Sequence, residues 1–280
     1  MITGTTRLLG IIGDPVAHSL SPVMHNAGFA ALGLDMAYVP LHVAADDIPA
    51  ALNGLVALGF RGANVTVPHK GAVLPFMDWL HDDARLVQAV NTIVVDDHHL
   101  HGYNTDIEGV RYALAQACGD TLVGQPALIV GAGGAARAVA LALARMSMPL
   151  TIVNRTASTA QRLVDLIQTA APAVPCRSLP LVDLTAATTA GQRLIVNATT
   201  LGMEGAGKVP AELVDTLTAG HVVFDVVYGH AETEFLRRAR RSGAETVDGL
   251  AMLLGQAASA FELWTGQRAP LEAMRRVLVR

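Results

Sequence analysis

The stretch Ala127–Leu141, ALIVGAGGAARAVAL, decides the fold of this chain. It begins with four apolar residues typical of a buried strand, then turns through glycines into a run of small residues typical of a helix. Gly131 permits the tight turn, Gly133 lets the backbone approach a pyrophosphate, and Ala136 allows the helix to pack closely on the strand. The pattern therefore predicts a dinucleotide site, with the phosphates on free N–H groups at the start of the helix.

The next apolar run, Leu150–Val153, indicates which dinucleotide is bound. It is followed by Asn154-Arg155-Thr156, where an NAD-binding domain usually offers an acidic side chain to the ribose. A carboxylate there would repel a 2′-phosphate, whereas the Arg155 guanidinium can bind the phosphate through paired hydrogen bonds. We therefore expect NADP as the cofactor. The alternative is that Arg155 is only a solvated residue at a strand end.

Composition narrows the range of partners. The 280 residues are 51% hydrophobic and 16% charged, which indicates compact globular domains rather than a disordered chain. A formal net charge of -4 favours neither nucleic acid nor an anionic membrane surface. We expect a small-molecule substrate as the partner, with no nucleic acid and no membrane. The sequence leaves open whether the chain is a monomer or a homodimer.

Sequence patterns also predict where the protein is located and whether it binds a metal. Residues 1–13 lack the pattern of a signal peptide, and the long apolar runs are interrupted by Arg, Gly or Pro, so we expect a cytoplasmic protein. Cys118 and Cys176 are far apart in sequence and are expected to be free thiols. The histidines between positions 98 and 101 lie in a predicted turn, where solvated polar residues are common, so we expect no metal site.

Strands and helices alternate along the chain, which predicts an α/β fold with two domains. Residues 106–248 are expected to form a dinucleotide-binding Rossmann domain, a doubly wound parallel sheet. Residues 1–105 are expected to form an N-terminal α/β substrate-binding and catalytic domain. The helices of residues 249–280 have no strand to cover in the Rossmann domain, so we expect them to complete the first domain. The segment 70–80 is interpreted as a helix that Pro75 kinks.

Polar residues gather near the predicted loops of the first domain. Asn64 and Thr66 differ by two positions, so on a strand they would face the same ligand. Lys70 would open a helix, where the helix dipole disfavours a cation, and this suits a group that gives up and recovers a proton. The alternative for Ser21 and Thr105 is that they cap helices and bind no ligand. The candidates from this domain and the start of the next are Ser19, Ser21, Asn64, Thr66, Lys70, Asn91, Asn104 and Asp106.

Six motifs, taken together and in this order, resemble the shikimate dehydrogenase family. They are GDPVAHSLSP (13–22), GANVTVPHK (62–70), AVNT (89–92), NTD (104–106), the glycine fingerprint with NRT (154–156), and GLAMLLGQAA (249–258). The resemblance implies reversible, NADPH-dependent reduction of 3-dehydroshikimate to shikimate, a step toward chorismate and the aromatic amino acids. It requires no metal.

The resemblance also implies roles for particular residues. Lys70 would be the catalytic acid and base, with Asp106 as its partner. The residues that would bind the hydroxyls and carboxylate of the substrate are Ser19, Ser21, Thr66, Lys70, Asn91, Asp106 and Gln256, with Asn64 and Tyr228 close by. The residues that would bind the cofactor are Gly131, Ala132, Gly133, Gly134, Ala135, Asn154, Arg155, Thr156, Val226 and Gly249.

Two departures from the family pattern leave alternatives open. Thr159 stands where many NADP-using members carry a second arginine, and Gly255 stands where a bulkier residue is frequent. A quinate/shikimate or aminoshikimate dehydrogenase that uses NAD or both cofactors is therefore an alternative. A catalytically silent dinucleotide-binding sensor is an alternative of another class, although a sensor would need neither Lys70 nor Asp106. A tetrahydrofolate dehydrogenase is disfavoured, because aromatic residues make up only 4% of the chain.

Overall fold

The computed structural model describes residues 2–203, 207–229 and 231–278, and over these residues the chain divides into two compact units. The first unit holds the chain up to Thr105 and again from Gln256 onward, and the second unit holds Asp106–Gly255. The chain returns to the first unit within helix α10 (Gly249–Thr265). The sequence-based boundary, at residue 249, lies at the start of that same helix.

The second unit is built on a parallel sheet. Its strands are β7 (Ala127–Val130), β8 (Leu150–Asn154), β9 (Cys176–Pro180), β10 (Leu194–Asn197), β11 (Val222–Asp225) and β12 (Glu245–Val247). They lie in the order β12-β11-β10-β7-β8-β9, and each neighbouring pair is parallel. The order reverses direction between β7 and β10, which is the switch point of a doubly wound sheet. The predicted Rossmann fold is confirmed.

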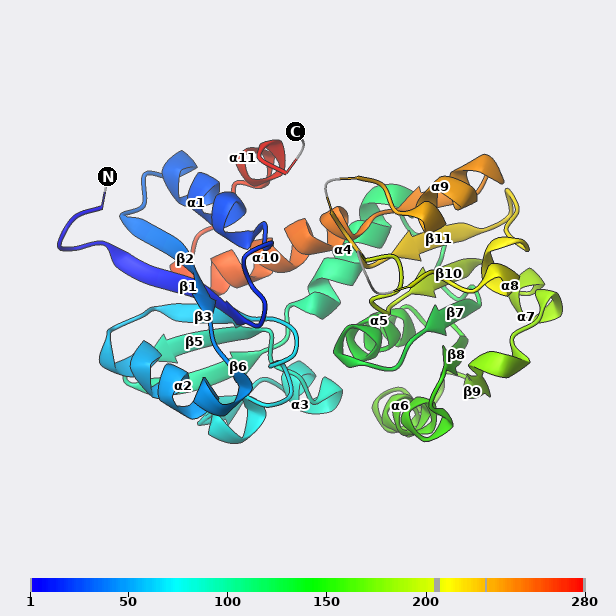
Figure 1. Cartoon of the computed structure of the whole chain (residues 1–280), viewed down its shortest axis with the longest axis horizontal. Helices are drawn as coiled ribbons and strands as arrows, with labels where there is room; N and C mark the ends of the chain where they lie inside the picture. Colours follow the sequence, from blue (N-terminus) through cyan, green and yellow to red (C-terminus); the bar gives the residue numbers. More distant parts are fainter. Residues whose placement is uncertain (1, 204–206, 230, 279–280) are drawn as a thin grey trace. The chain divides into compact units, whose positions relative to one another are not determined.

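Helices cover both faces of this sheet (Figure 1). The helices of the unit are α4 (Asp106–Cys118), α5 (Gly134–Arg145), α6 (Ala157–Ala170), α7 (Ala186–Ala190), α8 (Ala211–Val214) and α9 (Glu234–Arg241). On one face, α8 and α9 bury Leu213 and Phe235 against Leu128, Ile195 and Val223. On the other, α5 and α6 pack on β7 and β8. The central strands are buried throughout, as expected for a parallel sheet covered on both sides.

The first unit contains a mixed sheet in the order β2-β1-β3-β5-β6-β4. The strands are β1 (Arg7–Gly13), β2 (Met36–His42), β3 (Gly62–Val65), β4 (Trp79–Leu80), β5 (Thr92–Asp96) and β6 (His99–Tyr103). The helices are α1 (Ser21–Ala31), α2 (Ile48–Ala57), α3 (Asp82–Val87), the end of α10, and α11 (Leu271–Arg276). The pairs β1–β2 and β1–β3 are parallel, whereas the central strand β5 is antiparallel to both of its neighbours.

The predicted helix over residues 70–80 is wrong. The segment forms turns, a 3₁₀ turn at Leu74–Phe76, and the short strand β4, which pairs with β6. The backbone carbonyl of Lys70 accepts from Val90 N at 2.8 Å, and Asp78 N donates to Leu100 O at 2.9 Å. The local hydrogen bonds of the segment thus form only turns, and its ends bind Val90 and strand β6. A proline at position 75 also disfavours a continuous helix.

The C-terminal helices pack on the first unit. Phe29 of α1 stacks on Phe261 of α10, with ring centroids 5.3 Å apart, and Met274 of α11 is fully buried. Trp264 is also buried, and its Nε1 donates to the carbonyl of Ile93 in β5 at 2.9 Å. In the described part of the chain, no helix is long and apolar enough to cross a membrane.

We expect Gly62→Ala to lower the free energy of unfolding by about 2 to 3 kcal/mol. A Cβ on Gly62 would collide with Ile93 O and with Trp264 Nε1, the two atoms whose hydrogen bond holds α10 to the sheet. The matched control is Gly54→Ala within α2, where a Cβ meets nothing within 4 Å, and where alanine is a better helix former than glycine. The midpoints of urea unfolding curves measure the stability of both variants. Equal midpoints would contradict this packing.

Candidate active site and cofactor site

Asn91 is the centre of a buried polar network in the first unit. Its Oδ1 accepts from Thr105 N at 2.7 Å and from the Thr92 hydroxyl at 3.0 Å. Its Nδ2 donates to the Thr105 hydroxyl at 3.0 Å and to Gln256 Oε1 at 3.5 Å. Asn91, Thr105 and Gln256 are at most 7% exposed. The network therefore joins the start of β5, the residue before α4, and α10, which are far apart in sequence.

Asn64 supports this network from β3. Its Nδ2 donates to Asn91 O and to the Thr92 hydroxyl, both at 3.0 Å, and its Oδ1 accepts from the Tyr38 hydroxyl at 2.7 Å. An amide nitrogen carries two protons, so both donors of Asn64 are used within the protein. Thr66 lies one residue beyond β3, next to Gly13. Thr66 is therefore not part of the strand, and strand alternation does not place it on the same face as Asn64.

Ser21 and Thr66 have hydroxyl groups that form no hydrogen bond with any of the described residues. Ser21 is only 3% exposed, and it begins α1 without capping it; Ser19 Oγ accepts from Ser21 N instead, at 3.2 Å. The prediction that Ser21 caps the helix is therefore wrong. The Ser21 hydroxyl has no hydrogen-bond partner among the described residues, so it is available to a ligand.

Lys70 is half-buried and lies in a turn, not at the start of an α-helix. Its side chain therefore does not meet the positive end of a helix dipole. Its carbonyl accepts from Val90 N, so the backbone of Lys70 is bound to the residue next to Asn91. Thr105, which Asn91 also binds, directly precedes Asp106 in the chain.

Asp106 is the first residue of α4 and is 4% exposed. Tyr228, also in the second unit, lies close enough for the charge of Asp106 to act on it. Burial raises the pKa of Tyr228 above its ordinary value, and the negative charge of Asp106 raises it further. The structure thus places two of the candidate substrate-binding residues near each other.

The glycine turn after β7 has the geometry that the sequence predicts. Gly131 has φ +114°, and a Cβ there would lie 2.8 Å from Ala198 O, so only glycine fits. A Cβ on Gly133 or Gly134 would meet nothing within 4 Å, which leaves open space above the start of α5. Gly133, at the N-cap, provides no side chain to satisfy the first N–H groups of the helix. These donors suit the phosphates of a dinucleotide.

Val226 and Gly249 are in contact with each other. A Cβ on Gly249 would lie 2.5 Å from Val226 O, so the two backbones approach closely. Val226 N donates to Asn197 O at 3.0 Å, which places Val226 beside the end of β10. The structure therefore brings these two cofactor candidates together at the edge of the sheet where β7 ends in the glycine turn.

Arg155 is exposed between β8 and α6, and Asn154 Nδ2 donates to Thr156 O at 3.0 Å. No carboxylate among the described residues forms an ion pair with Arg155. This loop begins at the end of β8, next to β7 with its glycine turn. The donors present fit a phosphorylated ribose.

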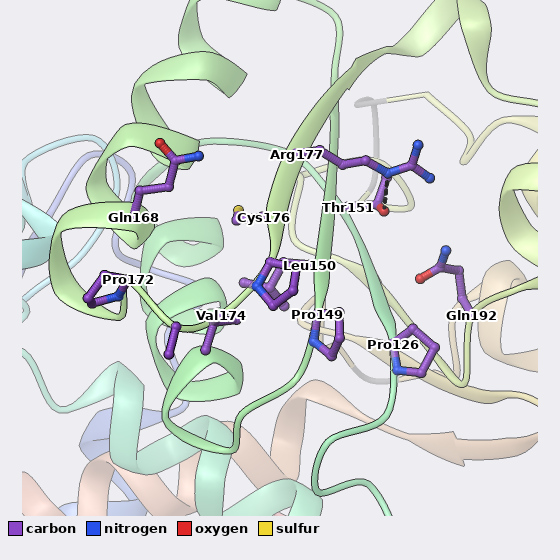
Figure 2. A pocket seen from close by; sticks show the side chains of 12 residues that line it. Pro126, Pro149, Leu150, Thr151, Gln168, Pro172, Val174, Cys176, Arg177 and Gln192 are labelled. Atoms are coloured by element: carbon purple, nitrogen blue, oxygen red, sulfur yellow. Dashed lines mark hydrogen bonds between the residues drawn. The ribbon is translucent and has the colours of Figure 1, made fainter.

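A hollow elsewhere on the second unit is not this site. This hollow has a volume of about 740 Å³ and is lined by Pro126, Pro149, Cys176, Arg177 and Gln192, among others. Figure 2 shows its lining side chains. These residues precede or begin β7, β8, β9 and β10, so the hollow lies at the amino ends of the strands. Ligands of doubly wound sheets bind at the carboxyl ends.

The described residues contain no group of three or more His, Cys, Asp or Glu side chains that could hold a metal ion. Cys118 and Cys176 are free. Burial raises the pKa of the Cys118 thiol to about 12 and that of Cys176 to about 11. Both thiols are therefore protonated at neutral pH and are poor nucleophiles.

Sequence reasoning missed several members of the polar network. It assigned Thr105 only a capping role, and it singled out neither Tyr38 nor Thr92. Their hydrogen bonds join β2, β3, β5 and the residue before α4, so no local spacing identifies them. The alternation of Tyr38 with apolar neighbours on β2 indicates only a buried position.

Known families match most of the chain. The Shikimate dehydrogenase substrate binding domain matches residues 11–93, Shikimate / quinate 5-dehydrogenase matches residues 113–215, and the Shikimate 5'-dehydrogenase C-terminal domain matches residues 249–279. The matches follow the order of the motifs in the sequence. They cover parts of both structural units.

Individual relatives agree with these matches. A shikimate dehydrogenase (NADP(+)) of Moorella thermoacetica is 46% identical over 285 residues, which is 99% of this chain and 94% of the relative. A shikimate dehydrogenase solved in complex with NADP+ is 38% identical, with a TM-score of 0.92 over 100% of this chain and 96% of that one. The shikimate 5-dehydrogenase of Thermus thermophilus, solved with NADP(H) and shikimate, is 35% identical, with a TM-score of 0.86 over 97% of this chain and 98% of that one. The chain belongs to the shikimate dehydrogenase family.

Proposed function

We propose that this chain is an NADP-dependent shikimate dehydrogenase, which reversibly reduces 3-dehydroshikimate to shikimate. One observation carries the proposal: this member of the family combines two features. One is a first unit that holds a buried polar network and hydroxyls with no partner among the described residues, which suits a polyol acid. The other is a glycine turn followed by an arginine loop, which suits a 2′-phosphorylated dinucleotide. Formation of NADPH from shikimate and NADP tests it.

We assign the cofactor to the second unit. Gly131, Ala132, Gly133, Gly134 and Ala135 would bind the pyrophosphate through backbone N–H groups. Asn154, Arg155 and Thr156 would bind the phosphorylated ribose. Val226 and Gly249, whose backbones touch, would lie beside the nicotinamide end.

The substrate would be bound chiefly by the first unit. Ser19, Ser21, Thr66, Asn91 and Gln256 would bind its hydroxyls and carboxylate, with Lys70, Asp106 and Tyr228 completing the set. Because both donors of Asn64 are used within the protein, we assign Asn64 the role of holding Asn91 and Thr92 in place. Residues 1–105 and 249–280 would then form the substrate-binding and catalytic domain, and residues 106–248 the cofactor domain.

The bound cofactor would supply the hydride that reduces the ring ketone. Lys70 would donate a proton to the ketone oxygen as negative charge develops there, and in the reverse direction it would accept the proton from the hydroxyl. Asp106 would stabilise the charged form of Lys70 and fix its position. Many short polar groups around the ring would hold the ketone in the orientation that the reaction requires.

We expect Arg155→Ala to raise the KM for NADP at least about tenfold, because a hydrogen bond to a charged group contributes about 1.5 to 3 kcal/mol. The KM for NAD, which has no 2′-phosphate, should change little. Initial rates with each cofactor measure both constants. Equal losses for the two cofactors would show that Arg155 does not read the phosphate.

We further propose that the enzyme acts in the cytoplasm, as a monomer or a homodimer, on a small molecule alone. Sedimentation equilibrium over a range of concentrations decides between the two oligomeric states.

A further inference from the structure

Thr159 and Arg162 form a pair on α6. Thr159 occupies the position where many NADP-using members of the family carry a second arginine, and Arg162 follows one helical turn later. Arg162 Nη2 donates to Thr159 Oγ1 at 3.0 Å. Thr159 is therefore not a cation itself but holds one in place.

The Arg162 side chain points toward the loop of Asn154, Arg155 and Thr156. Arg162 lies six residues after Thr156, which is about 9 Å along the axis of an α-helix. Side chains of a helix lean toward its N-terminus, and the bond to Thr159 shows that Arg162 does so. An extended arginine side chain that leans this way brings its guanidinium toward the loop that contains Arg155.

A second helix adds positive charge beside this pair. Helices α5 and α6 are in contact, and both follow strands next to the glycine turn (Figure 1). Arg137, in the first turn of α5, is half-buried. Burial lowers the pKa of Arg137, and the positive charge of Arg162 lowers it further. Two guanidinium groups therefore repel each other here, and an anion would offset that repulsion.

Arg155 and Arg162 have no ion-pair partner among the described residues. Asp165, the one carboxylate on α6, accepts from Gln161 instead. The exposed arginines of α9 differ: Arg237 pairs with Glu234, and Arg240 pairs with Glu232. The positive charge of Arg155 and Arg162 is thus not neutralised within the described chain.

We propose that Arg162 is the second cation that binds the 2′-phosphate of NADP, together with Arg155, and that Thr159 holds its guanidinium in position. The inference rests on the proposed use of NADP. It assigns cofactor specificity to a residue one turn beyond the position where the family usually places the second arginine.

The proposal is tested by measuring the Kd of 2′,5′-ADP and of 5′-AMP for the full chain. Calorimetry in the absence of substrate gives both values. Arg162→Gln should raise the Kd of 2′,5′-ADP about tenfold, and should leave the Kd of 5′-AMP unchanged within about twofold. Thr159→Ala, which keeps the cation but removes its hydroxyl partner, should raise the Kd of 2′,5′-ADP about threefold. The double variant Thr159→Arg with Arg162→Gln should regain affinity. Arg237→Gln is the control with the same change of charge.

The outcomes separate the two proposals. If the unchanged protein binds 2′,5′-ADP no better than 5′-AMP, the use of NADP is wrong, and this inference with it. If the protein prefers 2′,5′-ADP but Arg162→Gln behaves as Arg237→Gln does, only the role of Arg162 is wrong. An equal loss for both ligands would assign Arg162 a structural role in α6 and would also overturn the inference.

Discussion

Lys70→Ala is expected to lower kcat for shikimate oxidation by about 10²- to 10⁴-fold, the range that a positioned acid and base contributes. The KM for shikimate should change far less, because the substrate retains its other polar contacts. The fold should persist, since the hydrogen bond that ties Lys70 to Val90 uses the backbone carbonyl. Steady-state kinetics and a urea unfolding curve measure both effects.

The control for this variant is Lys208→Ala, because Lys70 and Lys208 are the only lysines in the sequence. Lys208 is exposed, and its removal should leave kcat unchanged. If Lys70→Ala turned over shikimate at a near-normal rate, Lys70 could not be the acid and base, and the proposed chemistry would lose its proton donor.

Asp106→Asn is expected to be severely impaired as well, with kcat lowered by at least about a hundredfold. Asparagine keeps the shape of the side chain but removes the negative charge that would pair with Lys70. The same change should lower the pKa of Tyr228, because the charge of Asp106 contributes to raising it, while burial keeps it above the ordinary value. Alkaline titration followed by tyrosinate absorbance measures that shift, and Tyr228→Phe identifies the signal.

A structural role for Asp106 predicts a different pattern. Asp106 begins α4, where a carboxylate favours the helix through its dipole. If that were its only function, the Asn variant would lose stability in urea, and the folded fraction would keep normal turnover. A fully folded Asn variant with unchanged kcat would exclude the pair of Lys70 and Asp106.

The Rossmann unit was predictable because its decisive residues are local. Gly131 needs a positive φ, and the strand before it and the helix after it follow directly in the sequence. The strand β9 was not predicted, because Cys176–Pro180 is a partly exposed edge strand that ends in proline and shows no clear alternation. The segment 70–80 was misread because its backbone pairs with strands much later in the chain.

The candidate site was predictable in its residue types but not in its connections. Spacing and resemblance singled out Asn64 and Asn91. Thr92, which binds Asn64, and Thr105, which binds Asn91, are brought to these partners only by the fold. The same limit applies to the cofactor loop. Thr159 looked like the loss of a cation, whereas its hydroxyl holds Arg162, and a hydrogen bond of this kind cannot be read from composition.

The initial rate of oxidation of shikimate and of quinate, each with NADP and with NAD, tests the central claim most directly. We predict the highest kcat/KM for shikimate with NADP, with at least about a tenfold preference over NAD from the arginine contact. Quinate with NAD oxidised as efficiently as shikimate with NADP would contradict the account and favour a quinate/shikimate dehydrogenase. No oxidation of either substrate, by a chain that still binds NADPH, would favour a catalytically silent dinucleotide-binding protein.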